Sequence, residues 1–155
     1  MKIRRMGAFV FCALVATLFC ESAAYAAPAS PCTLLTTAQV GTALSATFDK
    51  AIPVGAKVCE WIAKGVSGPN GTKKVEMVIV SANEFATRLT PMPAPVTRAP
   101  VSGVGDAANY ETTPLGGTLA VQKGDTYFLL QVRGVPLADQ QAIAVTLAQE
   151  ILSTL

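Results

Sequence analysis

Two strand-like runs on either side of a glycine turn decide the fold, and they occupy the stretch TLAVQKGDTYFLLQVR, residues 118–133. The runs, residues 118–123 and 126–133, flank Gly124-Asp125. A two-residue loop that begins with glycine suits the type II′ turn of an antiparallel hairpin. Apolar residues alternate along the second run, so these side chains are expected to face one core: Phe128, Leu130 and Val132.

Three more strands are predicted upstream of this hairpin, over residues 57–65, 73–80 and 108–112. Along the first of these strands, Cys59, Trp61 and Ala63 fall on one face. The turns that join the strands are expected at two glycine-containing dipeptides, Asn70-Gly71 and Gly116-Gly117.

Three helices are predicted, over residues 37–45, from Ser81 to about Leu89, and over residues 137–155. The first two begin with the capping-box pattern, in which a Ser or Thr side chain and a Glu or Gln three residues later bond the backbone at the first helical turn. The pairs that match this pattern are Thr36 with Gln39 and Ser81 with Glu84. The last helix has apolar residues at helical spacing: Ala144, Leu147, Ala148, Ile151 and Leu155.

The predicted order of elements is α-β-β-α-β-β-β-α. Tight hairpins require antiparallel neighbours, so the expected class is α+β, with helices packed on an antiparallel sheet. The prolines of residues 90–100 cannot continue the second helix. This proline tract is expected to be an extended connection, and it is a candidate for a mobile loop or a recognition segment.

The first 26 residues have the features of a signal peptide. Lys2, Arg4 and Arg5 precede an uncharged stretch, residues 6–19, and Ala24-Tyr25-Ala26 matches the pattern that signal peptidase recognises. The uncharged stretch would span about 21 Å as a helix, which is short of the roughly 30 Å of a bilayer core. The sequence therefore predicts residues 27–155 as one exported domain, periplasmic or secreted, without stable membrane insertion after cleavage.

The cysteines fit an oxidising compartment. Cys12 and Cys20 would leave with the signal peptide, and Phe19 is too bulky for the position that precedes a lipidated cysteine. Cys32 and Cys59 then have one possible intramolecular pairing. A bridge between them would stabilise the domain by about 3.5 kcal/mol in the chain-entropy model.

Composition excludes several kinds of chemistry. The 155 residues are 51% hydrophobic and 14% charged, so the chain can bury a core and is not a disordered polymer. Without the signal peptide, acidic and basic residues are equal in number, so charge does not point to nucleic acid. The chain has no histidine, which excludes Ser-His and Cys-His dyads and argues against a zinc site.

Short motifs in the domain resemble an uncharacterised family of small bacterial, mainly actinobacterial, secreted proteins and lipoproteins. The resemblance lies in Pro31-Cys32-Thr33-Leu34-Leu35-Thr36, Cys59-Glu60-Trp61, Gly103-Val104-Gly105-Asp106-Ala107-Ala108 and Leu119-Ala120-Val121-Gln122-Lys123-Gly124-Asp125. It implies a single exported domain with paired cysteines. It implies no activity.

The motif at residues 103–108 also matches G-x-G-x-x-A, the start of a dinucleotide-binding fingerprint. That fingerprint needs a preceding strand and a following helix, and here a proline tract precedes and a strand-like run follows. A tight turn explains the glycines better, and no cofactor is predicted.

Three acidic residues lie near glycine turns and are the candidates for carboxylate catalysis: Asp106, Glu111 and Asp125. Such turn residues are expected to be solvated and to have ordinary pKa values near about 4, which suits them poorly to acid catalysis at neutral pH. The sequence therefore favours a non-catalytic, exported binding or interaction module whose partner is an envelope protein or a small ligand. The candidate contact residues are Trp61, Pro93, Pro95 and Asp106.

Two alternatives stay open. One is a small envelope hydrolase that uses Asp and Glu carboxylates, which would need two of them about 5–10 Å apart in a cleft. The other is an inhibitor-type protein that presents the proline tract, residues 90–100, to a partner. For Trp61, packing near the disulfide is favoured over stacking on a ligand.

Overall fold

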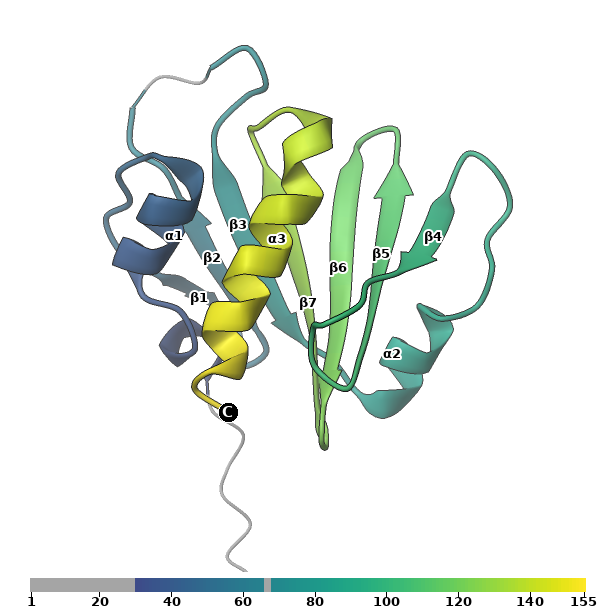
Figure 1. Cartoon of the computed structure of the whole chain (residues 1–155). Coiled ribbons are helices and arrows are strands. Elements are labelled where there is room, and N and C mark those ends of the chain that lie inside the picture. The colour runs from purple at the N-terminus through teal and green to yellow at the C-terminus, as the bar shows by residue number, and fades with distance from the viewer. Residues whose placement is uncertain (1–29, 66–67) are drawn as a thin grey trace, which may run out of the picture.

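The computed structural model describes residues 30–65 and 68–155, and the predicted signal peptide, residues 1–26, lies outside them. The described residues form a seven-stranded antiparallel sheet with three α-helices and one 3-10 turn (Figure 1). This confirms the α+β class. The elements in chain order are η1 (Pro31–Thr33), α1 (Thr37–Leu44), β1 (Ile52–Val54), β2 (Val58–Ile62), β3 (Lys74–Ile79), α2 (Ala82–Thr87), β4 (Thr97–Pro100), β5 (Ala107–Thr113), β6 (Gly116–Lys123), β7 (Thr126–Arg133) and α3 (Leu137–Leu152).

The sheet consists of two meanders. Its strand order is β1-β2-β3-β7-β6-β5-β4, so β1 to β3 and β4 to β7 are each joined to their neighbours in sequence. The two meanders meet where β3 pairs with β7, from Lys74 opposite Arg133 to Ile79 opposite Phe128. The predicted β6–β7 hairpin is confirmed, because Lys123 pairs with Thr126 around Gly124-Asp125.

The two edge strands, β1 and β4, are absent from the predicted order. β4 occupies the end of the proline tract, which was expected to be a connection throughout. An edge strand has a partner on one side only, so proline is tolerated where an N–H would point to solvent. Pro53 in β1 and Pro100 in β4 fit this rule, which is why proline alone does not exclude strand at an edge.

The predicted turn at Gly116-Gly117 is wrong. Thr113 pairs with Gly116, so Pro114 and Leu115 form the loop and both glycines belong to β6. Gly117 is required by close packing, because a Cβ there would lie 2.0 Å from the hydroxyl of Tyr110 on the neighbouring strand.

The turn predicted at Asn70-Gly71 is displaced by one residue. The Gly71 N–H donates to the Gly68 carbonyl, so Pro69 and Asn70 are the two central residues. Proline favours the first central position of a β-turn and glycine the position after the second, and this preference outweighs the Asn-Gly signal.

Both capping boxes are confirmed. The Thr36 hydroxyl accepts from the Gln39 N–H at 3.2 Å, and Gln39 Oε1 accepts from the Thr36 N–H at 2.8 Å. Ser81 and Glu84 make the same pair of bonds at 3.2 and 2.7 Å. Each box satisfies backbone donors at a helix start that would otherwise lack partners.

The main core lies between one face of the sheet and the helices α1 and α3 (Figure 1). The predicted periodicity of α3 is confirmed at Ala144, Leu147, Ala148 and Ile151, which are buried. Leu155 is exposed because α3 ends at Leu152. We call the sheet face under these helices the covered face.

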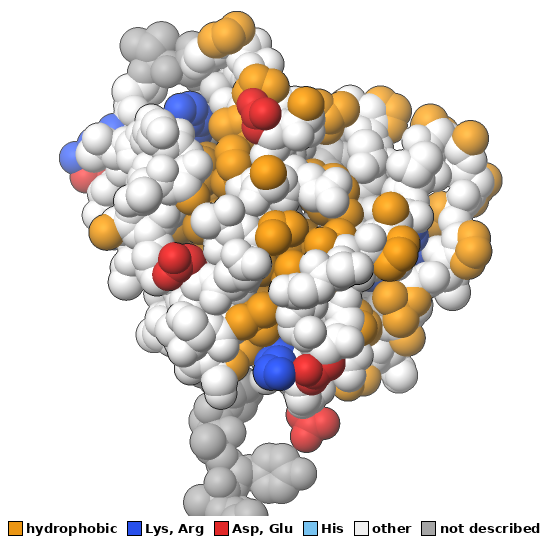
Figure 2. All heavy atoms as spheres, viewed as in Figure 1, with side chains coloured by type: hydrophobic (Ala, Val, Ile, Leu, Met, Phe, Trp, Pro, Cys, Tyr) orange, Lys and Arg blue, Asp and Glu red, His pale blue; other side chains and the backbone are white. Residues whose placement is uncertain are grey.

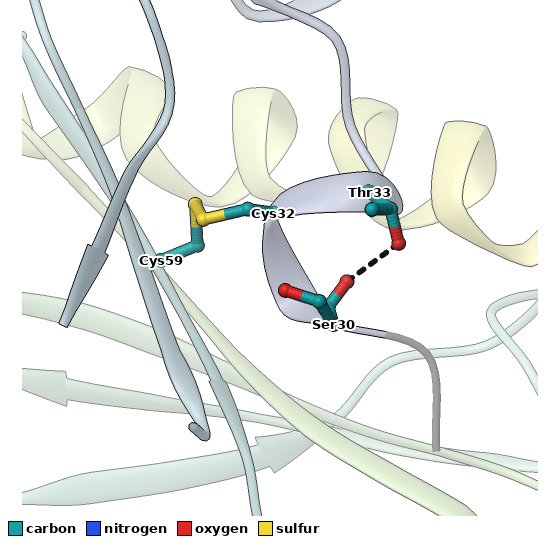
Figure 3. Close-up of a disulfide and its surroundings, with 4 residues drawn as sticks. All are labelled: Ser30, Cys32, Thr33 and Cys59. Atoms are coloured by element: carbon teal, nitrogen blue, oxygen red, sulfur yellow. Dashed lines mark hydrogen bonds between the residues drawn. A yellow bond between two sulfur atoms is a disulfide. The ribbon is translucent and has the colours of Figure 1, made fainter. Parts of the chain in front are cut away.

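The predicted disulfide is confirmed between Cys32 and Cys59, whose Cα atoms are 5.1 Å apart (Figure 3). It joins η1, directly before α1, to β2. Beside it, the Thr33 hydroxyl donates to the Ser30 carbonyl at 2.7 Å and tightens this turn. The bridge therefore attaches the start of the described chain to the sheet.

Candidate functional site

The sheet face opposite α1 and α3 carries a continuous row of polar side chains. Successive residues of a strand point to opposite faces, so residues that pair across strands share a face. One register line crosses all seven strands on this open face. From edge to edge it consists of Ile52, Glu60, Glu76, Gln131, Thr118, Glu111 and Arg98, and we call it the polar row.

The next register line on the open face is mainly apolar. It consists of Val54, Val58, Val78, Leu129, Ala120, Asn109 and Pro100. Helix α2 lies over part of this line, where it contacts β6 and β7. Phe85 of α2 is buried there, with its ring centroid 5.4 Å from that of Tyr127.

A pocket of about 390 Å³ is formed where α2 meets the open face. Its floor comes from β3, β6 and β7, and its wall from α2 and the residue that follows it. We call it the α2 pocket, and its lining residues are Glu76, Val78, Val80, Glu84, Thr87, Arg88, Thr118, Leu129 and Gln131.

One end of the α2 pocket is basic. Arg98 makes two contacts with Glu111 Oε2, at 2.8 Å from Nε and 2.6 Å from Nη2, while Arg88 Nη1 lies 3.2 Å from Glu111 Oε1. The exposed fractions of the side chains are 9% for Arg98, 16% for Glu111 and 35% for Arg88. The cluster of two arginines and one carboxylate has a net positive charge. Arg88 is the most exposed side chain of the three.

This position of Glu111 corrects the expectation that it is a solvated turn residue. Glu111 lies in the middle of β5, on the open face, and is largely buried between two arginines. A buried carboxylate needs such partners to offset its lost hydration. The glycine turn near it in sequence says nothing about this environment, because the partners Arg98 on β4 and Arg88 after α2 come from other segments of the chain.

The other end of the α2 pocket is acidic. Lys74 Nζ lies 2.7 Å from Glu60 Oε1 and 3.2 Å from Glu76 Oε2, so two carboxylates share one ammonium group. The hydrogen bond from Lys74 lowers the pKa of Glu60, and the same bond raises the pKa of Lys74. The net charge of this cluster is negative.

Glu84 adds a second anionic group to the pocket. The Ser81 backbone N–H donates to its carboxylate and holds the pKa of Glu84 below its usual value, with a further contribution from the Ser81 hydroxyl. Glu84 is therefore fixed as an anion one helical turn before Arg88.

The proline tract has a fixed base and an exposed tip. Arg98 Nη1 donates to the Thr87 carbonyl at 2.7 Å and to the Thr90 carbonyl at 2.5 Å, so the guanidinium that holds Glu111 also holds the start of the loop. Pro93 and Pro95 are exposed in this loop, as are Leu89 and Met92. Figure 2 shows hydrophobic side chains along this segment, at the right of the view.

Asp106 lies at a hairpin end and is exposed. Its carboxylate accepts from the Gly124 N–H at 2.7 Å and from Lys123 Nζ at 2.9 Å. The bond from Gly124 lowers the pKa of Asp106, with help from Lys123, so the expected ordinary pKa is corrected downward. Asp125 is exposed in the same hairpin turn. Neither residue lines the α2 pocket, nor does Glu111.

The two glycines of residues 103–108 both have positive φ, and Gly105 also serves a close approach to β6. A Cβ on Gly105 would lie 2.3 Å from the Gln122 carbonyl oxygen. Strand β5 follows this segment, where a dinucleotide fingerprint would have a helix.

Trp61 is fully buried on the covered face, two residues from Cys59 in β2. Of the four predicted contact residues, then, one lies in the core, two lie in the loop after α2 and one lies at the β6–β7 hairpin. The structure does not bring them together.

The sequence interpretation missed Arg88, Arg98 and Glu84 as site residues. Lys74 and Glu76 do alternate with buried residues along β3, which marks the polar face of a strand. Nothing in the sequence places Arg98 beside Glu111, because that contact depends on the unpredicted pairing of β4 with β5.

Within residues 30–65 and 68–155, no group of His, Cys, Asp and Glu side chains is arranged to hold a metal ion. In the same residues, no helix is long and apolar enough to cross a membrane. Comparison of the chain with family models, curated proteins and solved structures finds no match.

Proposed function

We propose that this protein is an exported, non-catalytic binding module of the bacterial envelope, and that it binds a small ligand in the α2 pocket. The observation that carries this proposal is the pocket itself, a hollow with fixed charges of both signs and a floor of mixed polar and apolar side chains. Ligand sites are typically concave, largely apolar and provided with a few well-placed polar groups. The volume of about 390 Å³ is at the lower end of the range for small molecules.

The pocket is formed by hydrogen-bonded elements whose charged side chains are held by other groups of the protein. Its floor consists of central strands, and ion pairs and a capping box orient its charged groups. A site whose groups are already oriented binds without the cost of ordering them.

The three carboxylates singled out in the sequence do not form a catalytic pair. Asp106 is engaged by the β6–β7 hairpin, Glu111 by two arginines, and Asp125 is exposed at a turn. A carboxylate mechanism needs two such groups facing one substrate, and these three are engaged separately.

Binding to the pocket can be tested with the isotope-labelled domain, residues 27–155, by NMR. We expect a low-molecular-mass fraction of envelope extract to shift the backbone amide signals of Thr118, Leu129 and Gln131. As a control, the amide signals of α3, which packs on the covered face, should not shift. Absence of pocket shifts, or shifts confined to the loop after α2, would contradict the proposal.

A second candidate function is an inhibitor-type interaction through the proline tract. Arg98 fixes the base of this loop while its apolar tip is exposed, an arrangement suited to insertion into a partner. If this role holds, Leu89→Ser together with Met92→Ser should abolish capture of an envelope protein that the unaltered domain retains. Leu115→Ser, at a different exposed apolar turn, is the matched control.

Export rests on the signal-peptide pattern, on the family resemblance and on the disulfide, which suits an oxidising compartment. We propose a periplasmic or secreted location, with cleavage before Ala27. Expression of the full chain followed by N-terminal sequencing tests this, and a membrane-bound product that retains Met1 would refute it.

A further inference from the structure

We infer that the α2 pocket recognises a short peptide with both ends free, of about three residues, in extended conformation. This inference rests on the proposed function and names the ligand class for the same site. It starts from the separation of the two charged ends of the pocket.

The basic and acidic ends are held apart rather than paired with each other. Glu84 bends back to Ser81 at the start of α2, while Arg88 reaches across to Glu111 on β5. Glu76, the other anion in the pocket, lies on β3 beside Lys74. A ligand that binds between them therefore meets negative charge at one end and positive charge at the other.

Each end retains unused hydrogen-bonding capacity. Among the residues that the structure describes, Glu84 Oε1 has no hydrogen-bond partner, and Arg88 uses only Nη1. An arginine can bind a carboxylate through two parallel N–H bonds. The acidic end suits an ammonium group and the basic end suits a carboxylate.

The spacing of the strands sets the length of the ligand. Glu76 and Glu111 belong to the same polar row and are three inter-strand steps apart, through β7 and β6. At about 4.8 Å per step this is about 14 Å. Arg88 reaches inward from the Glu111 end, so the charges to be bridged lie about 10–12 Å apart. Three extended residues span about 10 Å.

The middle of the pocket matches a peptide backbone with small side chains. Gln131 and Thr118 of the polar row offer an amide and a hydroxyl to peptide groups, while Val78 and Leu129 offer an apolar floor. The pocket is thus complementary to a peptide with free termini along the whole length of that peptide. A simple anion would contact only the basic end.

The test uses the domain with its disulfide intact, and trialanine as the probe. We expect saturable binding that shifts the amide signals of Thr118, Leu129 and Gln131. N-acetylated trialanine and trialanine amide, each with one charge removed, should bind at least about tenfold more weakly. Dialanine, which is too short to reach both ends, should also bind more weakly.

Two variants assign the ends of the peptide. In Arg88→Gln, amidation of the peptide should no longer change the affinity. In Glu76→Gln, at the end from which the spacing is counted, acetylation of the peptide should change the affinity much less than in the unaltered domain. Gln at residue 76 keeps the size of the side chain and an oxygen that can accept from Lys74, so β3 should stay paired. Lys123→Gln and Asp106→Asn remove the same kinds of charge outside the pocket and should retain the full preference for free ends.

The peptide inference is overturned if blocked and free trialanine bind equally, or if trialanine causes no shift in the pocket. If envelope extract shifts the pocket amide signals and trialanine does not, the peptide inference is wrong and the proposed binding function is retained. Where neither causes a shift, both proposals fail. The blocked peptides need no variant, so these outcomes do not depend on Arg88→Gln folding.

Discussion

The two faces of the sheet differ in chemistry although the same strands build both. The covered face places Cys59, Trp61, Met77 and Leu130 against helices, in a core closed to solvent. The open face places carboxylates, arginines and amides in one row and leaves a pocket beside α2. If the open face binds the ligand as proposed, we expect stability to reside mainly on the covered face and ligand binding on the open face.

The sharpest test of this division uses two leucines that are adjacent in β7. Leu130 is fully buried on the covered face, and Leu129 is partly buried on the open face. Leu130→Ala should lower the free energy of unfolding by about 4 kcal/mol, because it leaves a cavity in a closed core. Leu129→Ala should cost about 1 kcal/mol. Urea denaturation measures both, and equal losses would contradict the division.

The disulfide tests how far the covered face depends on its covalent bond. Replacing Cys32 and Cys59 together by Ser should lower the free energy of unfolding by about 3.5 kcal/mol, since the unfolded chain regains the freedom of a closed loop. Reduction of the unaltered protein should cause a similar loss. Free thiols in natively purified protein would show that the bridge is not formed.

The buried ion pair tests whether the open face also contributes to stability. Arg98→Gln should cost about 2 kcal/mol, because Glu111 stays largely buried with one cation fewer and the loop after α2 loses its two bonds to Arg98. Arg88→Gln, at a more exposed position, should cost less than about 1 kcal/mol. In the double variant Arg98→Gln with Glu111→Gln, part of the loss should return.

A smaller effect is expected from pH. The pKa of Glu60 is lowered by its bond from Lys74, so its contribution to stability is complete above the unfolded pKa near 4.5 and is lost as the pH falls through the lower folded pKa. Unfolding followed between about pH 6 and pH 3 should therefore show a shallower decline in Glu60→Gln than in the unaltered protein. Lys74→Met should flatten the same region, and an unchanged profile in both would exclude this pair as a cause.

The smallest effects are expected at the exposed aspartates. Asp106→Asn keeps an oxygen that can accept from the Gly124 N–H but loses the charge that pairs with Lys123. It should reduce stability slightly, and Asp125→Asn should change it even less. If a hydrolytic activity is found in the purified domain, neither variant should abolish it. Loss of turnover in either would favour the hydrolase alternative.

Local patterns in the sequence determined the class of this fold. The alternation of Phe128, Leu130 and Val132, the Gly124-Asp125 turn, the two capping boxes and the spacing of the alanines in α3 each depend on residues a few positions apart. The disulfide followed from counting, because only one pairing was available. These features can be predicted from sequence because the interactions that produce them are local or, for the disulfide, because only one pairing is possible.

Tertiary structure alone decided the edges of the sheet and the site. Strands β1 and β4 are short, contain proline and exist only because β2 and β5 offer them a neighbour. Arg98, Glu111 and Arg88 come from three separate segments. The register of β4 on β5 brings Arg98 to Glu111, and the packing of α2 on the sheet brings Arg88 there. No tight two-residue turn fixes the register of β4 on β5, because residues 101–106 separate the two strands, and the position of Arg88 depends on how α2 packs on the sheet.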